Sequence, residues 1–315
     1  MTCNAAAGID AGKLFLDVAF APRETTFRVN NTPDGIKTII ARLRRASIAT
    51  VVIEAIGVYA APLVRALTSA GCTVGIVNPR RIKAFRDAEG KRAKNDRLDA
   101  ALIARFAVTM TDAVRPLPSD HQMTIKALAT RRRQVVEMGA MEKTRLKQAP
   151  DERIADSHRK IIAALQAERQ AIEDKLDALI ARSPELTRRC QIFNSIPGIG
   201  KQVATVLATD MPELGNLDRR GAASLAGLAP HIQQSGTAKG RAQISGGRPC
   251  VRAALYMAAL SAARYNPEHK AAYTQMRGNG KPAKIALIAI ARRIIILANA
   301  LVKTDQLFEK QHPRP

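Results

Sequence analysis

Hydrophobic and polar positions in the first quarter of the chain follow the periods of strands and helices in turn. Residues 8–20 predict a strand, a tight turn at Gly12 and a second strand, and residues 25–29 predict a third. The pattern continues with a helix after the turn cluster 31–34, a buried strand over 49–54, a helix over 59–70 and a fifth strand over 72–77. Three strands followed by strands that alternate with helices predict a mixed sheet with helical cover.

Beyond Pro116 and Pro118 the chain becomes strongly helical. Residues 121–147 form one helical segment, and Pro150 separates it from a second segment, in which Arg169 interrupts the apolar seam. Apolar side chains of the second segment keep the three-four spacing of a coiled-coil seam, at Ile162, Leu165, Ile172, Leu176 and Leu179. This spacing predicts a long amphipathic hairpin, which is either an internal scaffold or a dimer contact.

One predicted helix start carries two acidic residues. If the helix begins at Asn95 or Asp96, then Asp96 and Asp99 lie three residues apart on one face, where side chains are neighbours. The same face continues into the apolar residues of 102–106, so Asp99 points toward the apolar side. A carboxylate in that position is costly unless it is paired or bound to a metal. The alternative is that Asn95 caps the helix and the acids only favour the positive end of its dipole.

Two further acids fall within the predicted sheet, Asp10 on the first strand and Glu54 at the end of the fourth. This order of elements and acids is the ribonuclease H-like, RuvC-type arrangement. Such a cluster at strand ends would hold Mg²⁺ through hard oxygen ligands, and two ions could activate a nucleophile and stabilise the leaving oxygen in phosphodiester cleavage. Taken singly, Asp10 is equally well a turn-capping residue and Glu54 a strand-end acid that faces solvent.

The charge of the chain narrows the class of partner. Of 315 residues, 50 are Lys or Arg and 27 are Asp or Glu, which gives a formal charge of +23 and an isoelectric point near 10.6. An excess of this size points to nucleic acid. Aromatic residues make up only 3% and Trp is absent, so recognition is expected to use phosphates, shape and arginine rather than base stacking.

The remaining composition indicates a folded protein of the cytoplasm. The four cysteines are far apart and imply neither a zinc site nor a disulfide framework. Asp10 and Asp17 interrupt the apolar start of the chain, which argues against a signal peptide. The longest apolar run, 285–302, is split by Arg292 and Arg293, so we expect a soluble protein.

A competing interpretation takes residues 8–13 as the first phosphate loop of an actin-like kinase or ATPase. That fold needs a second loop rich in Asp and Gly further along the chain, and none is found. The charge of +23 also fits nucleic acid better than a nucleotide alone.

Several basic residues are candidates for phosphate contacts, although a run of charge is more often a solvated face. The turn Ile196-Pro197-Gly198-Ile199-Gly200 before Lys201 resembles a helix-hairpin-helix, in which a helix N-terminus offers N–H groups to a phosphate. Its alternative is an ordinary helix-helix turn. The predicted nucleic-acid contacts before the last loop are Arg80, Arg81, Lys91, Arg92, Lys94, Arg131, Arg132, Arg133, Gly198, Gly200 and Lys201.

The last candidate segment is a glycine-rich loop over 227–249. Four cations in and just after it, Lys239, Arg241, Arg248 and Arg252, could clamp a phosphate. Ser235 sits among them and is the preferred nucleophile, because positive charge stabilises the oxyanions of a phosphoryl transition state. Ser245 and Ser224 compete for that role, and a serine in a loop is more often a turn former.

The whole chain resembles the DEDD-type insertion-sequence transposases of the IS-one-ten family, which are RNA-guided recombinases. The resemblance rests on Gly8-Ile9-Asp10, Glu54, residues 94–100, residues 196–200, and Gln234-Ser235-Gly236 with residues 245–248. It implies an α/β plus all-α architecture: a RuvC-like DEDD catalytic domain over 1–115, a helical coiled-coil linker over 116–185 and a mainly helical C-terminal transposase domain with a helix-hairpin-helix over 186–315.

The resemblance also implies roles and partners. It maps the metal-binding and catalytic acids onto Asp10, Glu54, Asp96 and Asp99, and the serine nucleophile of a covalent protein–DNA intermediate onto Ser235. A structured bridge RNA would select donor and target DNA, and a dimer of dimers would combine the acids of one subunit with Ser235 of another. Two alternatives remain open: a metal-only RuvC-like junction nuclease, and a non-catalytic basic binder whose acids cap helices.

Overall fold

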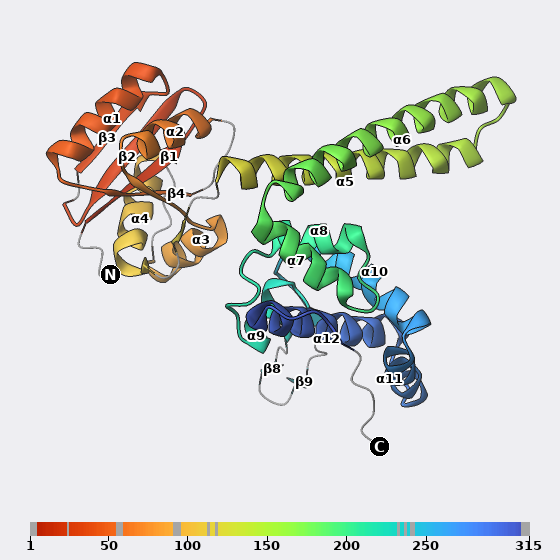
Figure 1. The fold of residues 1–315 in the computed structure, drawn as a ribbon. Coiled ribbons are helices and arrows are strands. Elements are labelled where there is room, and N and C mark those ends of the chain that lie inside the picture. The colour runs from red at the N-terminus through yellow and green to blue at the C-terminus, as the bar shows by residue number, and fades with distance from the viewer. Residues whose placement is uncertain are drawn as a thin grey trace. The chain divides into compact units, whose positions relative to one another are not determined.

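The computed structural model describes residues 5–23, 25–54, 59–90, 96–111, 114–116, 119–231, 234–235, 238–239 and 243–309. The chain divides into two compact units, 1–118 and 119–315, which are described separately here (Figure 1). The hairpin predicted as a linker belongs to the second unit. The finer division into three domains stays a prediction.

The first unit contains the predicted mixed sheet. Its six strands are β1 Ala6–Ala11, β2 Phe15–Ala21, β3 Thr25–Asn30, β4 Thr50–Ile53, β5 Thr73–Ile76 and β6 Arg115–Pro116. They lie in the order β3-β2-β1-β4-β5-β6. The first three strands pair antiparallel, β1, β4 and β5 pair parallel, and the short β6 is antiparallel to β5. The mixed sheet and its first five strands are therefore confirmed.

Helices cover both faces of this sheet (Figure 1). One face packs against α1 Pro33–Arg45 and α2 Ala61–Ser69 through a core that includes Ile9, Leu16 and Leu63. The other face packs against α3 Pro79–Ala88 and α4 Asp96–Thr109. The sequence pattern did not predict α3. This helix is rich in Lys and Arg, and only Ile82 of it is buried, so it lacks an apolar period, although Asn78 caps it and Pro79 is its first residue.

Helix α4 lies unusually close to β1 because Gly8 has no side chain. A Cβ atom at Gly8 would lie 2.3 Å from the backbone nitrogen of Ala104 and 2.4 Å from the carbonyl oxygen of Ala100. Small residues extend the close packing of α4 to the neighbouring strand, since Ala19 and Ala21 of β2 form one buried cluster with Ala100 and Ala104 of α4. The helix that carries Asp99 is thereby held directly against the strand that carries Asp10.

The second unit begins with the predicted long hairpin, formed by α5 Asp120–Lys147 and α6 Glu152–Ala181, which lie side by side (Figure 1). Ser119 and Gln122 form a capping box at the start of α5, and Asp151 caps α6. Ile172 and Leu176 of the predicted seam are buried in the core of the unit. A coiled-coil geometry for this hairpin stays a prediction.

The rest of the second unit is mainly helical, as predicted. Its helices are α7 Pro184–Ser195, α8 Lys201–Asp210, α9 Arg219–Leu225, α10 Pro249–Tyr265, α11 Pro267–Gly278 and α12 Ala283–Thr304. Four two-residue strands lie between α9 and α10: β7 Pro230–His231, β8 Gln234–Ser235, β9 Ala238–Lys239 and β10 Gln243–Ile244. Length and composition alone would let α12 cross a membrane. In this fold eight of its residues are buried in the core.

Substitution of Gly8 tests the contact between α4 and β1. Gly8→Ala should lower the free energy of unfolding by roughly 1–3 kcal/mol, because the new Cβ meets backbone atoms that cannot rotate away. The measurement is urea unfolding followed by circular dichroism. Gly139→Ala in α5 is the control, since a Cβ there meets nothing within 4 Å, and it should stabilise by up to about 1 kcal/mol. Equal effects of the two substitutions would contradict the close packing.

Candidate active site

Asp10 and Glu54 are brought together by the register of two parallel strands. Ile9 of β1 pairs with Ile53 of β4. Asp10 directly follows Ile9, and Glu54 directly follows Ile53. Both are partly buried. Because parallel strands present their carboxyl ends at the same edge of a sheet, the two acids lie at neighbouring positions of one edge. This is the juxtaposition that the sequence predicted.

Asp99 lies on the apolar face of α4, also as predicted. It is only 6% exposed, and Leu102, Ile103 and Phe106 on the same side of the helix are buried in the core. Asp96 is the first residue of α4, and its side chain lies outside the described part of the structure. The two helix acids are thus carried by the element that packs directly on β1.

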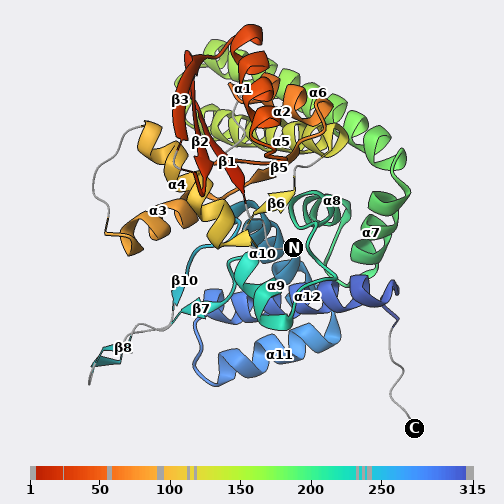
Figure 2. The same ribbon diagram turned by 90° about the vertical axis from the view of Figure 1, so that its left-hand side faces the viewer.

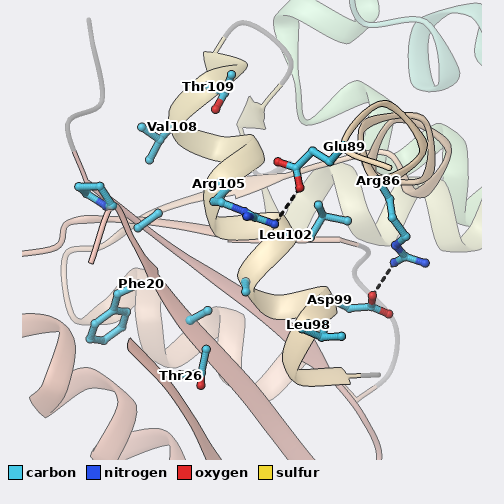
Figure 3. A pocket seen from close by; sticks show the side chains of 14 residues that line it. Phe20, Thr26, Arg86, Glu89, Leu98, Asp99, Leu102, Arg105, Val108 and Thr109 are labelled. Carbon is cyan, nitrogen blue, oxygen red and sulfur yellow. Dashed lines mark hydrogen bonds and ion pairs between the residues drawn. The ribbon is translucent and has the colours of Figure 1, made fainter. Parts of the chain in front are cut away.

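The partner of Asp99 is Arg86 of α3. Its Nη2 donates a hydrogen bond of 2.5 Å to Oδ1 of Asp99, and both side chains are largely buried, at 17% and 8% exposure (Figure 3). A second pair joins the same helices, since Nη2 of Arg105 lies 2.8 Å from Oε2 of Glu89. Asp99 is therefore charge-compensated by an arginine in this structure.

A cavity of about 560 Å³ opens beside these ion pairs, between α3, α4 and the end of β2. Its walls are mostly apolar, with Phe20, Leu98 and Leu102 among the lining side chains (Figure 3). Of Asp10, Glu54 and Asp99, the three predicted acids whose side chains the structure describes, only Asp99 lines it. The cavity therefore adjoins one member of the predicted cluster and does not contain the strand edge of Asp10 and Glu54.

Asp17 of β2 is a buried acid to which sequence reasoning gave no role in the site. It pairs in register with Asp10 across the antiparallel strands, so the two residues belong to the same face of the sheet. Asp17 is 2% exposed, accepts hydrogen bonds from Nε and Nη2 of Arg28, and has Nε of Arg97 at 4.0 Å. The signal was an acid flanked by apolar neighbours within a strand, which indicates a paired charge.

The donor chemistry fits a hard divalent cation, since carboxylate oxygens are the ligands that Mg²⁺ prefers. Asp10 and Glu54 at adjacent strand ends, with α4 packed alongside, are suited to hold such an ion. Within the described residues, no three side chains of His, Cys, Asp or Glu come together. The four-acid metal site therefore stays a prediction.

The turn between α7 and α8 has two glycines with different roles. Gly198 has a positive φ of 92°, and a Cβ there would lie 2.7 Å from the Ala258 carbonyl oxygen and the Ala262 side chain. It is therefore required for close packing on α10. Gly200 caps α8 and has open space around it, so the N-terminus of α8 is the part of this turn that a phosphate could approach.

Cations predicted to contact phosphates beside this turn are partly engaged by acids of α6. Arg132 of α5 forms an ion pair of 2.6 Å with Glu173, and Lys201 forms one of 2.5 Å with Asp177. Arg131 has only a long hydrogen bond of 3.5 Å to Gln134. The pair of Arg132 and Glu173 joins the two helices of the hairpin, and that of Lys201 and Asp177 joins the hairpin to α8, so a stabilising role accompanies any role in binding.

The predicted cations around the glycine-rich loop are also placed in part. Both Nη atoms of Arg248 contact Glu213, at 2.7 Å and 2.6 Å. Arg252 donates to the carbonyl oxygen of Gly246 at 3.0 Å. Ser235 pairs with Ala238 in the two-stranded ladder of β8 and β9, which also contains Lys239.

The other predicted contacts fall into three groups. Arg80 and Arg81 are exposed in the first turn of α3. Arg133 is exposed on α5 and lines a cavity beside Arg132, Lys201 and Cys250. Lys91, Arg92, Lys94 and Arg241 lie outside the described residues. The neighbours of these residues within the chain do not test whether they bind phosphate, so these contacts stay predictions.

Comparison with known proteins identifies the family. A family model of DEDD transposases of the IS110 (IS-one-ten) type matches residues 7–152, and a second, described as "Transposase IS116/IS110/IS902 family", matches residues 190–274. The two matches together span most of the chain, one in each half. The chain belongs to the IS110 family of insertion-sequence transposases. The predicted class, an enzyme that transfers DNA strands, is thereby confirmed.

Individual relatives agree with this assignment. Proteins named "Pilin gene-inverting protein" from Moraxella bovis and Moraxella lacunata are each 29% identical, over 96% of this chain and 97% of theirs. An insertion element IS110 protein of Streptomyces coelicolor is 28% identical over 48% of this chain and 37% of its own. Among solved structures, one titled "T. thermophilus RuvC in complex with Holliday junction substrate" is similar. The alignment covers 36% of this chain and 99% of that chain, at 20% identity and a TM-score of 0.28.

Substitution of Arg86 tests whether this arginine compensates the buried negative charge of Asp99. Arg86→Gln should lower the free energy of unfolding by about 2–4 kcal/mol, because it leaves a carboxylate buried without its cation. Adding Asp99→Asn should recover much of this loss, since the buried charge is then gone. The measurement is urea unfolding of both variants.

The control is the exposed pair of Lys37 and Asp34, whose side chains are 77% and 89% exposed. Lys37→Ala should change the free energy of unfolding by less than about 0.5 kcal/mol. If Arg86→Gln had as small an effect as Lys37→Ala, Arg86 would not be what makes the burial of Asp99 tolerable.

Proposed function

We propose that this transposase is an RNA-guided DNA recombinase that uses Asp10, Glu54, Asp96 and Asp99 to hold Mg²⁺ and Ser235 as its nucleophile. The observation that carries the proposal is the adjacency of Asp10 and Glu54 at paired strand ends, together with the packing of α4 on β1. These contacts bring the elements of all four acids to one region of one sheet. A carboxylate cluster of this kind is suited to phosphodiester chemistry.

The side chains divide this work between binding and positioning. Asp10 and Glu54 supply carboxylates from a rigid sheet edge, and Asp99 joins them when it exchanges Arg86 for the cation. When bound, Mg²⁺ would polarise the scissile phosphate and lower the pKa of the attacking hydroxyl group. Arg86 would then be free to contact a phosphate oxygen of the substrate at the same place.

Ser235 supplies the covalent step of the proposal. Its Oγ atom would attack phosphorus, the bond from phosphorus to the leaving DNA oxygen would break, and the serine proton would pass to that oxygen. A second DNA hydroxyl group would later attack the ester, join the strands and return the proton to Ser235. The support is the set of cations in and just after its loop, Lys239, Arg241, Arg248 and Arg252, and the family resemblance at 234–236.

Rejoining is favoured over simple cleavage by the names of the two Moraxella relatives. Inversion of a gene requires strands to be cut and joined again, and those relatives match this chain over nearly its full length. The alternative, a metal-only junction nuclease, would hydrolyse the phosphodiester and discard the bond energy. We therefore extend strand exchange, rather than degradation, to this chain.

RNA guidance is the part of the proposal that rests on composition. A charge of +23 suits two nucleic-acid strands, whereas 3% aromatic residues and no Trp leave few platforms for reading bases. Guide pairing would then select donor and target DNA, as in other guided effectors.

Assembly as a dimer of dimers is supported by apolar side chains exposed on the α5–α6 hairpin, such as Met141 at 52% and Ile161 at 45%.

Ser235→Ala and Asp10→Asn, compared in one assay, test this function. The RNA–protein complex is incubated with cognate DNA, and products are separated with and without protease treatment. Wild type should give recombinant DNA and a protein-linked strand that maps to the peptide containing Ser235. Ser235→Ala should lose both products, and Asp10→Asn should lose all cleavage, while both variants keep nucleic-acid binding.

Three kinds of result would contradict parts of the proposal. Recombination by Ser235→Ala, or an adduct that maps to Ser245 or Ser224, would remove Ser235 from its role. Free cleaved ends from Ser235→Ala that still depend on Asp10 would support the metal-only nuclease. Unchanged cleavage by Asp10→Asn, or after chelation of divalent ions, would remove the acids from catalysis.

A further inference from the structure

A groove of about 470 Å³ lies between the start of α9 and the middle of α12, outside every site discussed so far. The two helices pack against each other in both views of the second unit (Figures 1 and 2). Four of the six residues that line the groove are arginines, and the full lining is Arg219, Arg220, Ala289, Arg292, Arg293 and Ile296. It is therefore a strongly positive feature.

The helical period explains why α12 contributes a continuous wall. Ala289, Arg292, Arg293 and Ile296 are spaced at i, i+3, i+4 and i+7, so they share one face. Most residues between them are buried in the core, which fixes the rotation of the helix. The two arginines that split the longest apolar run of the chain thus point away from the core and into the groove.

The opposite wall is held in place by Asn299, a buried side chain of α12. Its Oδ1 accepts the N–H of Gly215 at 2.9 Å, and its Nδ2 donates to the carbonyl oxygen of Leu217 at 2.8 Å. These two bonds fasten the segment just before α9 to α12. Arg219 and Arg220 are consequently held opposite Arg292 and Arg293 before any ligand arrives, which reduces the ordering cost of binding.

The four arginines have no internal counter-charge among the described residues: the structure gives none of their side chains a hydrogen bond or an ion pair there. The acids nearest in sequence to the α9 wall serve elsewhere. Asp218 accepts the N–H of Gly221 at 2.7 Å as the cap of α9, and Glu213 is held by Arg248. Arg293 of the α12 wall lies near a histidine: the pKa of His269 is lowered first by burial and also by the positive charge of Arg293.

The chemistry of the groove favours phosphate as its ligand. Converging guanidinium groups repel one another unless an anion lies between them, and their planar donors match phosphate oxygens in pairs. A second copy of this chain is a poor occupant, because it carries 27 acidic against 50 basic residues. Among the described residues no aromatic side chain lines the groove, which favours contacts with the phosphate backbone, independent of base sequence, over base stacking.

We propose that Arg219, Arg220, Arg292 and Arg293 form a binding site for the phosphate backbone of nucleic acid. The site extends the proposed function and rests on it for the ligand class, since a strand-transfer enzyme must hold strands beyond the reacting phosphate. It adds a further place of contact to those that the sequence predicted around the acids, on α5, at the turn before α8 and in the glycine-rich loop.

The test is the salt dependence of binding by the full-length protein, measured as fluorescence anisotropy of a labelled duplex DNA and of an unrelated single-stranded RNA. Arg219→Gln with Arg220→Gln, and separately Arg292→Gln with Arg293→Gln, should flatten the plot of log affinity against log salt. The expected change is about 0.9 per lost contact for duplex and about 0.7 for single strands, thus up to roughly 1.8 for each pair on duplex.

Two matched variants control for charge and for folding. Arg44→Gln with Arg45→Gln removes the same charge from an adjacent exposed pair on α1 of the first unit, and it should leave the slope within about 0.3 of wild type, well under one contact. Arg219→Lys with Arg220→Lys keeps the charge and should keep the slope. Both arginines of the α9 pair are exposed, so this pair carries the test if the α12 variant fails to fold.

The outcomes separate the site from the proposed function, because binding is measured without strand transfer. Flattening by the groove pairs alone supports the site even if cleavage assays fail, and an effect on DNA only or RNA only names the strand that is held. Unchanged slopes in the groove variants, or equal flattening by the Arg44 and Arg45 control, would overturn the proposal. Loss of self-association with an unchanged slope would assign the groove to a second copy of the chain and also overturn it.

Discussion

The contact between α4 and β1 at Gly8 is the constraint on which the first unit depends. Because no side chain separates the two elements, the helix that carries Asp96 and Asp99 lies directly on the strand that carries Asp10. The parallel pairing of β1 with β4 then adds Glu54 at the neighbouring strand end. The absence of a side chain at one point of a strand thus permits the close approach of the helix that carries two of the predicted acids.

Buried charges cost free energy unless they are paired with opposite charges. The two units of the protein differ in which charges are paired and with what. In the first unit the buried acids have arginine partners, with Arg86 on Asp99 and Arg28 on Asp17. In the second unit Arg132 and Arg248 are compensated by acids of the chain itself. The arginines between α9 and α12 lack such partners among the described residues, which is why we assign them an external anion.

Much of this arrangement could be predicted from local sequence patterns. Period-two and helical spacing gave the strands and helices of the mixed sheet, and the helical period placed Asp99 on the apolar face of α4. The acids at strand ends followed from the order of the elements. These features depend on residues close together in the chain, where the stereochemistry of the backbone leaves few alternatives.

Features that depend on contacts between distant segments could not be predicted in the same way. Arg86 binds Asp99 because α3 packs on α4, where the rings of Phe85 and Phe106 meet edge to face at 5.4 Å. A run of cations gives no sign of which members will find acids within the fold. The same limit applies to the groove of α9 and α12, whose two walls are brought together by Asn299 from more than seventy residues away.

In the proposed function, Asp10, Glu54, Asp96 and Asp99 form one binding site for a divalent cation. Anomalous scattering from crystals soaked with Mn²⁺, a stand-in for Mg²⁺, tests it without relying on activity. We predict a peak within roughly 2–2.6 Å of carboxylate oxygens of Asp10 and Glu54, with Asp99 turned from Arg86 toward the ion. A peak elsewhere, or no peak while Asp99 still binds Arg86, would contradict the account.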